Sequence, residues 1–168
     1  MLEIINNLEP FFENCYREIS VREYSRLAKI TPPTASKLLK KFASQGLLKK
    51  REERGFILFQ ANRENQILRS LSKIYWEEKL KSLTSYLEKQ LRSDAIVLFG
   101  SLINLEVNEN SDIDIAVFTK FKKEIDLKNF EKSLSKEIQL FVFESLEKVN
   151  KELRVGITNG YILKGTLR

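Results

Sequence analysis

Two short motifs in the second half of the sequence have residue types and a spacing that could do chemistry. Gly100-Ser101 ends one apolar run, and Asp112-Ile113-Asp114 opens another after ten intervening residues. Alternate residues of a strand point to the same side, so we expect the two carboxylates to project together from α-carbons about 6 to 7 Å apart. The sequence has no histidine and a single cysteine, and hard oxygen ligands of this kind favour Mg²⁺ or Mn²⁺.

Gly100-Ser101 suits the other half of such a site. A glycine lets the backbone approach a phosphate closely, while the Ser101 hydroxyl and neighbouring backbone amides can hold the phosphate oxygens. A cation on Asp112 and Asp114 would neutralise a triphosphate and the charge that develops during phosphoryl transfer. The alternative is that Ser111-Asp112 only begins a turn and that neither aspartate binds a ligand.

The sequence around these motifs predicts the elements that position them. The apolar runs at 95–99 and 115–118 indicate strands, the first of them buried on both faces, and a third strand is expected at 137–143. A helix from Asp126, a helical stripe through 146–157 and a last strand that closes at Gly165 complete the unit. We therefore expect an α+β fold with a small mixed sheet and flanking helices.

The pattern Gly-Ser, ten residues, Asp-x-Asp between two strands resembles the signature of the polymerase β-like nucleotidyltransferases, especially the minimal nucleotidyltransferases of archaeal type. The resemblance covers about residues 76–168. It implies that Gly100 and Ser101 bind ATP or another nucleoside triphosphate, and that Asp112 and Asp114 are catalytic residues that hold the metal. The implied reaction transfers a nucleoside monophosphate, AMP from ATP in our interpretation, to a protein or nucleic-acid acceptor and releases pyrophosphate. The resemblance also suggests a helical toxin-type partner protein.

Members of that family normally supply a third carboxylate from a later strand, and here the matching position is Gln139. Glutamine is neutral, so it cannot act as a base for the attacking hydroxyl or hold a second metal ion as tightly. Glu137, two residues earlier on the same face, is the candidate to replace it as a catalytic residue. Residues 102–105 also lack the arginine and glycine usual after Gly-Ser. Two functions stay open: a Mg²⁺-dependent transferase, and a DNA-binding regulator whose transferase domain senses a nucleotide without turnover.

The first 62 residues predict a winged helix-turn-helix domain. Ser20–Glu23 has the spacing of a capping box at the start of a short helix. Thr31-Pro32 starts a second amphipathic helix, and Gly46 is placed to end it. A hairpin is expected around the charged turn 49–55. This order of elements resembles the helix-turn-helix domains of archaeal and bacterial regulators.

The predicted second helix and hairpin carry an excess of positive charge. Residues 25–54 contain nine basic and two acidic residues, which favours a polyanionic partner such as DNA, with a helix in the major groove. The residues expected nearest the base edges are Thr34, Ser36 and Lys37. The expected phosphate contacts are Lys37, Lys40, Lys41, Lys49, Lys50, Arg51 and Arg54. RNA binding, dimerisation, protein docking and a merely solvated basic surface are the alternatives.

We expect three parts along the chain: the winged helix at 1–62, a helical connector at 63–91 and the nucleotidyltransferase domain at 92–168. The connector contains no proline or glycine, and its apolar stripes would pack in a core or form the seam of a homodimer. The single cysteine, Cys15, suits a reducing cytoplasm. The sequence has no run of roughly 20 apolar residues to cross a membrane and no indication of a signal peptide, so we expect a cytoplasmic protein.

Overall fold

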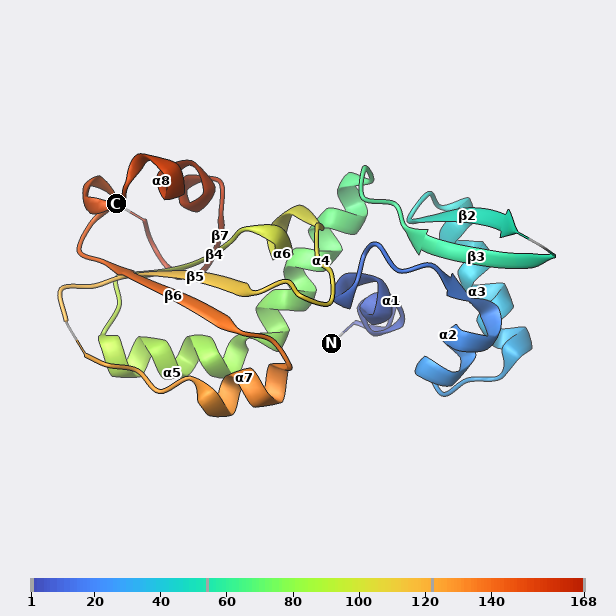
Figure 1. The fold of residues 1–168 in the computed structure, drawn as a ribbon, viewed down its shortest axis with the longest axis horizontal. Coiled ribbons are helices and arrows are strands. Elements are labelled where there is room, and N and C mark those ends of the chain that lie inside the picture. Colours follow the sequence, from blue (N-terminus) through green and yellow to red (C-terminus); the bar gives the residue numbers. More distant parts are fainter. Residues whose placement is uncertain (1, 54, 122, 168) are drawn as a thin grey trace. The chain divides into compact units, whose positions relative to one another are not determined.

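The computed structural model describes residues 2–53, 55–121 and 123–167. Figure 1 shows the helices and strands of these ranges. They combine helices with two separate sheets, one of three strands and one of four, so the predicted α+β fold class is confirmed. No helix within these ranges is both long enough and apolar enough to cross a membrane.

The chain forms two compact units, which are Met1–Tyr75 with Leu105–Glu109 and Trp76–Asn104 with Asn110–Arg168. The division at Tyr75 lies inside the stretch that was expected to be a connector. The segment Leu105–Glu109 departs from the expected limits of the C-terminal domain because it belongs to the first unit. Leu105 and Val107 are fully buried, and the backbone N–H of Cys15 donates to the Val107 carbonyl at 2.9 Å.

The first unit combines short helices with a three-stranded antiparallel sheet in the order β1-β3-β2. Its elements are α1 (Glu3–Glu13), β1 (Ile19–Ser20), α2 (Val21–Leu27), α3 (Pro32–Ser44), β2 (Leu48–Glu53) and β3 (Phe56–Ala61), and α4 (Gln66–Lys79) leads out of it. The sequence predicted α2, α3 and the β2–β3 hairpin but not α1 or β1. Helix α1 forms because its apolar residues recur at helical spacing. The buried ones are Ile5, Leu8, Phe11 and Phe12.

Capping residues start α2 and α3 where the sequence predicted. Ser20 is the N-cap of α2, and its hydroxyl accepts a hydrogen bond from the backbone N–H of Glu23 at 3.3 Å. The Glu23 carboxylate forms an ion pair with Arg17, which replaces the reciprocal half of a capping box. Thr31 has the N-cap position of α3 but its side chain makes no capping hydrogen bond to the backbone; its hydroxyl instead shares a hydrogen bond of 2.9 Å with the Thr34 hydroxyl.

The second unit is built around a mixed four-stranded sheet in the order β6-β5-β4-β7. Its elements are α5 (Lys81–Leu91), β4 (Ala95–Phe99), α6 (Ser101–Asn104), β5 (Ile113–Phe118), α7 (Lys128–Leu134), β6 (Ile138–Phe143), the 3-10 helix η1 (Leu146–Lys148), α8 (Lys151–Thr158) and β7 (Tyr161–Gly165). Strand β4 is antiparallel to β5 and β7, whereas β5 and β6 are parallel. Figure 1 shows α5 and α7 on one side of this sheet and α8 on the other. The small mixed sheet with flanking helices is therefore confirmed.

The strand before the Gly-Ser motif is buried on both faces, as its continuous apolar sequence predicted. None of the five residues of β4 is more than 5% exposed. On one face, Val97 and Phe99 form a core cluster with Val149 and with Ile157 of α8. Directly paired residues of neighbouring strands share a face, so Asp114, the partner of Phe99, projects from the same face as this cluster. The sheet therefore fixes the direction of the Asp114 side chain.

Tyr161 at the start of β7 leads to a prediction about alkaline stability. Its hydroxyl donates a hydrogen bond of 2.5 Å to Glu77 Oε2, and this bond, with burial, raises the pKa of Tyr161 from 10.0 to about 12. Because the folded pKa lies above the unfolded value, the stabilising contribution is complete below pH 10 and is lost as the pH rises toward about 12.

We expect Tyr161→Phe to lower the free energy of unfolding at neutral pH by about 1 kcal/mol. The variant should also lose less stability than the wild type on going through the alkaline range, because it lacks the bond that ionisation removes. Urea denaturation of both proteins at a series of pH values measures the difference. Stability curves that stay parallel at all pH values would contradict the prediction.

Candidate active site

The two predicted aspartates lie at the start of β5, an inner strand of the four-stranded sheet. Asp114 is paired in register with Phe99 of β4 on one side and with Gln139 of β6 on the other. Asp112 comes one residue before β5, and its Oδ2 accepts a hydrogen bond of 2.6 Å from the Gln139 amide nitrogen. Both aspartates are half-buried. The structure thus brings Asp112, Asp114 and Gln139 together at one edge of the sheet.

Gly100 directly follows β4 and lies against the Asp114 carboxylate. Its φ is +77°, which is the left-handed region that favours glycine. A Cβ atom at this position would lie 2.2 Å from Asp114 Oδ2, so any larger residue would have to displace the carboxylate. The two predicted halves of the site, the Gly100-Ser101 bend and the aspartate pair, are therefore immediate neighbours.

Gly100→Ala is expected to lower the free energy of unfolding by about 1–3 kcal/mol through backbone strain and also to weaken cation binding, because Asp114 must move. Gly55→Ala is the matched control. Gly55 has a similar φ of +79°, but among the described residues, its chain neighbours aside, no atom lies within 4 Å of the position of its Cβ, so only stability should change. Urea denaturation and titration with Mn²⁺ measure the two effects. Equal behaviour of the two variants toward Mn²⁺ would contradict the prediction.

Ser101 is half-buried and is the first residue of α6, directly after Gly100. Leu102 and Ile103, which depart from the usual family pattern, are 0% and 4% exposed. This apolar segment contributes to the interior of the second unit, and its departure from the pattern is explained by packing.

The electrostatics of the site favour a cation. Burial raises the pKa of the Asp114 carboxyl above its ordinary value, and the neighbouring charge of Asp112 raises it further. Two carboxylates that repel each other in this way are stabilised by a positive charge between them. Their oxygen atoms fit a hard divalent cation such as Mg²⁺ or Mn²⁺. In the described ranges no group of three or more His, Cys, Asp or Glu side chains is placed to hold a metal ion.

Gln139 contacts the site through its side chain, whereas Glu137 contacts it through its backbone. The sequence identified Gln139 as the neutral residue at the third carboxylate position, but it did not predict that the amide binds Asp112. Glu137 lies just before β6 with its side chain exposed, and its backbone carbonyl accepts a hydrogen bond of 2.8 Å from the N–H of Ile113. Glu137 thus lies beside Asp112, one residue before the neighbouring strand begins, and its role as a base stays a prediction.

The residues expected to contact nucleic acid lie on two elements of the first unit. On α3, Thr34, Lys37, Lys40 and Lys41 are exposed and Ser36 is half-buried. Among the described residues, none forms an ion pair with the three α3 lysines. On β2, Lys49, Lys50 and Arg51 are exposed, and Arg54 lies outside the described residues.

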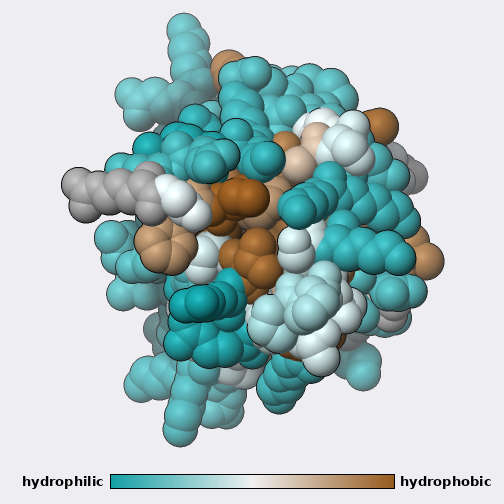
Figure 2. Space-filling view, turned by 90° about the vertical axis from the view of Figure 1, so that its right-hand side faces the viewer, coloured by the Kyte–Doolittle hydropathy of each residue, from teal (hydrophilic) through white to brown (hydrophobic). Residues whose placement is uncertain are grey.

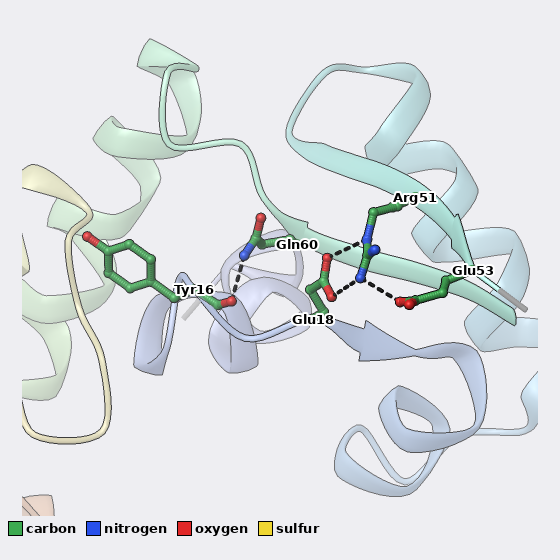
Figure 3. Close-up of polar contacts among 5 residues, drawn as sticks. All are labelled: Tyr16, Glu18, Arg51, Glu53 and Gln60. Carbon is green, nitrogen blue, oxygen red and sulfur yellow. Dashed lines mark hydrogen bonds and ion pairs between the residues drawn. The ribbon is translucent and has the colours of Figure 1, made fainter.

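Figure 3 shows that Arg51 on β2 is occupied by acidic partners from its own unit. Its Nε and Nη2 donate to the two carboxylate oxygens of Glu18 at 2.9 and 2.6 Å, and Glu53 lies 2.8 Å from Nη2. The bond from Arg51 holds the pKa of the Glu18 carboxyl below its usual value. Lys49 is also paired, with Glu64 at 3.1 Å. Arg51 and Lys49 of β2 therefore already have protein partners, in contrast to the three lysines of α3.

Figure 2 looks at the side on which β2, β3 and α3 lie in Figure 1. Hydrophilic residues cover most of this face and surround a small hydrophobic centre. The exposed lysines of α3 give the first unit positive charge that is available to a polyanion.

Comparison with known proteins identifies the second unit. A family model described as polymerase beta, nucleotidyltransferase matches residues 81–164, which is half of the chain. The match runs from α5 to β7 and includes the Gly100-Ser101 bend, the aspartate pair and Gln139. A search of curated proteins and a search of solved structures each gave no significant match. The α+β unit with its bend and its paired carboxylates is a nucleotidyltransferase domain, and the chain belongs to the polymerase beta nucleotidyltransferase family.

Proposed function

We propose that the protein is a Mg²⁺-dependent nucleotidyltransferase that transfers a nucleoside monophosphate, AMP from ATP, to a hydroxyl group of a protein or nucleic-acid acceptor. The observation that carries this proposal is the close approach of Gly100 to Asp114, where a Cβ atom would lie 2.2 Å from Oδ2. Only a glycine lets the backbone of the bend lie directly against the carboxylate, which keeps the backbone amides proposed to bind phosphate beside the residues proposed to bind the cation. The family match supports the reaction class.

Each group of the chain has a task in the proposed reaction. Gly100 and Ser101 bind the triphosphate oxygens through backbone amides and the Ser101 hydroxyl. Asp112 and Asp114 would hold Mg²⁺, which when bound offsets the negative charge of the triphosphate. The acceptor oxygen forms a bond to the α-phosphorus, the bond to the bridging oxygen of the β-phosphate breaks, and pyrophosphate leaves. Glu137 takes the acceptor proton in this proposal, because the neutral Gln139 cannot.

Pyrophosphate release by the full-length protein tests this function. The protein is incubated with each of the four nucleoside triphosphates and Mg²⁺, with and without cell extract as a source of acceptors, and nucleotide binding is measured in parallel. We expect release with ATP, its loss when a chelator removes the metal, and its return with Mg²⁺ or Mn²⁺. Nucleotide binding without release from any triphosphate would overturn the proposed turnover.

One contact favours a second function, a DNA-binding regulator whose transferase domain senses a nucleotide without turnover. The Gln139 amide donates to Asp112 at 2.6 Å, so a neutral group occupies the place of a base. In the first unit, the order α1, β1, α2, α3, β2, β3 with the sheet β1-β3-β2 supports the proposal of a winged helix. In this reading α3 enters the major groove and its lysines contact phosphates.

Substitutions on α3 and β2 separate the two candidate DNA-binding elements. The triple variant Lys37→Ala/Lys40→Ala/Lys41→Ala is expected to weaken duplex binding and to reduce the slope of log K against log salt by about 2.7, at about 0.9 per phosphate contact. Arg51→Ala is the matched control, and it should change little because two carboxylates already bind its guanidinium. Fluorescence anisotropy between about 50 and 200 mM salt measures both. A wild-type affinity that does not depend on salt would rule out this role.

A further inference from the structure

Lys136 is a buried cation beside the candidate active site, and the proposed reaction does not use it. Among the described residues it is the one charged side chain that is buried, at 9% exposed. Two hydrogen bonds to Glu131 hold the turn after α7, in which Lys136 lies. The backbone N–H of Lys136 donates to the Glu131 carbonyl at 3.3 Å, and the N–H of Ile138 donates to Glu131 Oε1 at 3.1 Å. Removing an ammonium from water costs free energy unless hydrogen bonds replace the lost hydration.

One partner of the ammonium lies immediately before Asp112 in the chain. Lys136 Nζ donates a hydrogen bond of 3.1 Å to the backbone carbonyl of Ser111. Between α6 and β5, residues 105–112 form neither helix nor strand, so regular secondary structure does not fix the backbone on this side of Asp112. The hydrogen bond from Lys136 therefore holds the backbone in place immediately before Asp112.

The start of β6 also holds Asp112 at two other points. Just after Asp112, the N–H of Ile113 donates to the carbonyl of Glu137 at 2.8 Å. The Asp112 carboxylate accepts from the Gln139 amide at 2.6 Å. The backbone before Asp112, the backbone after it and its side chain are thus each bound by one stretch of four residues that begins at Lys136.

We infer that Lys136 is a positioning residue for Asp112, whose ammonium fixes the Ser111 carbonyl and so directs the Asp112 carboxylate toward a divalent cation. The part that concerns the cation rests on the proposed function, whereas the fixing of the backbone does not. Lys136 acts through Asp112, so its loss would leave both carboxylate ligands in the chain but change how well one of them is held. Groups that orient a metal ligand in this way typically affect metal affinity by about 10- to 100-fold.

Lys136→Met in the full-length protein tests the inference, because methionine keeps an unbranched apolar side chain without a donor. In metal-free protein, amide hydrogen exchange at 108–114 is expected to become at least about tenfold faster, while 95–99 in β4 is unchanged. Titration with Mn²⁺ alone, followed by electron paramagnetic resonance, should show a dissociation constant raised about tenfold. Lys136→Arg restores a charged donor and should recover most of both effects. Lys132→Met, an exposed lysine of α7, is the matched control and should change neither.

The outcomes distinguish the role of Lys136 from the cation site. Unchanged exchange at 108–114 in Lys136→Met would overturn the positioning role, and so would faster exchange across the whole second unit. Wild-type protein that binds no Mn²⁺ would instead overturn the cation site of the proposed function, while the exchange measurement still decides the role of Lys136. If Lys136→Met does not fold, Lys136→Gln takes its place. Its amide exchange at 108–114 is then expected to be faster than in the wild type but slower than in the unfolded chain, and it is judged by the same comparison with β4.

Discussion

Gln139→Glu is expected to raise the rate of pyrophosphate release in Mg²⁺ by about 100-fold. Glu137, the base of the proposed reaction, is exposed and lies just outside β6, whereas a general base held in position contributes about 10²- to 10⁴-fold. Residue 139 is paired with Asp114 across the parallel strands, and its amide reaches the Asp112 carboxylate. A glutamate side chain here can therefore accept the acceptor proton or bind the cation. The side chain is exposed, so the change of amide to carboxylate disturbs little packing. Pyrophosphate release from ATP by the full-length protein gives the rate.

The same substitution exchanges an attractive contact for repulsion between carboxylates. In the presence of a chelator, Gln139→Glu should therefore have a lower Tm than the wild type, and Mg²⁺ should restore it by binding the folded state. Gln139→Ala is the matched control, since it removes the bond to Asp112 without adding a carboxylate and should not raise the rate. A glutamate variant that gains Mg²⁺-dependent stability but no activity would show that the lack of a carboxylate at position 139 does not limit the reaction.

Asp112→Asn/Asp114→Asn is expected to lower nucleotidyl transfer by at least about 1000-fold. Losing a group that merely orients a metal ligand costs about 10- to 100-fold, and this variant replaces both charged ligands. Asparagine keeps the size of the side chain, so the contact with Gly100 is retained. Because the charge of Asp112 raises the pKa of Asp114, the variant also removes a repulsion, and its Tm in chelator should be higher than that of the wild type.

A variant with the same change in charge controls for nonspecific electrostatics. Glu147→Gln/Glu152→Gln removes two exposed carboxylates from the same unit and should retain full transfer activity and full Mn²⁺ affinity. Rates from pyrophosphate release and dissociation constants from Mn²⁺ titration are compared across the three proteins. If the aspartate variant keeps its Mn²⁺ affinity, the cation binds elsewhere and the proposed arrangement is wrong.

The second unit could be predicted largely from the sequence because its strands are continuous apolar runs. Residues 95–99 were expected to be buried on both faces, and all five are. The bend at Gly100-Ser101 and the aspartates were expected to form one site. Antiparallel pairing of β4 with β5 explains why they do, since it aligns the end of one strand with the start of the other, with Phe99 opposite Asp114.

The features that could not be predicted depend on contacts between distant residues or on very short elements. The bond from Gln139 to Asp112 joins residues 27 positions apart, and no local pattern encodes it. In α2, helical spacing from the buried Tyr24 would place Leu27 on the same face, but Leu27 is 46% exposed. Ser25 is buried instead, and its hydroxyl donates to the Ile30 carbonyl at 2.6 Å. Helix α2 has seven residues, which is too few turns for periodicity to define a face.

The segment Leu105–Glu109 limits where the chain can be cut into fragments that fold separately. It lies in the loop between the bend and the aspartates, yet it belongs to the first unit, where its buried leucine and valine lie beside Cys15. A fragment cut at Trp76 would retain Gly100 and Asp112 but expose those apolar side chains to water, and it would be prone to aggregate. A recombination event at Trp76, in the laboratory or in evolution, would therefore not yield a nucleotidyltransferase unit that folds on its own.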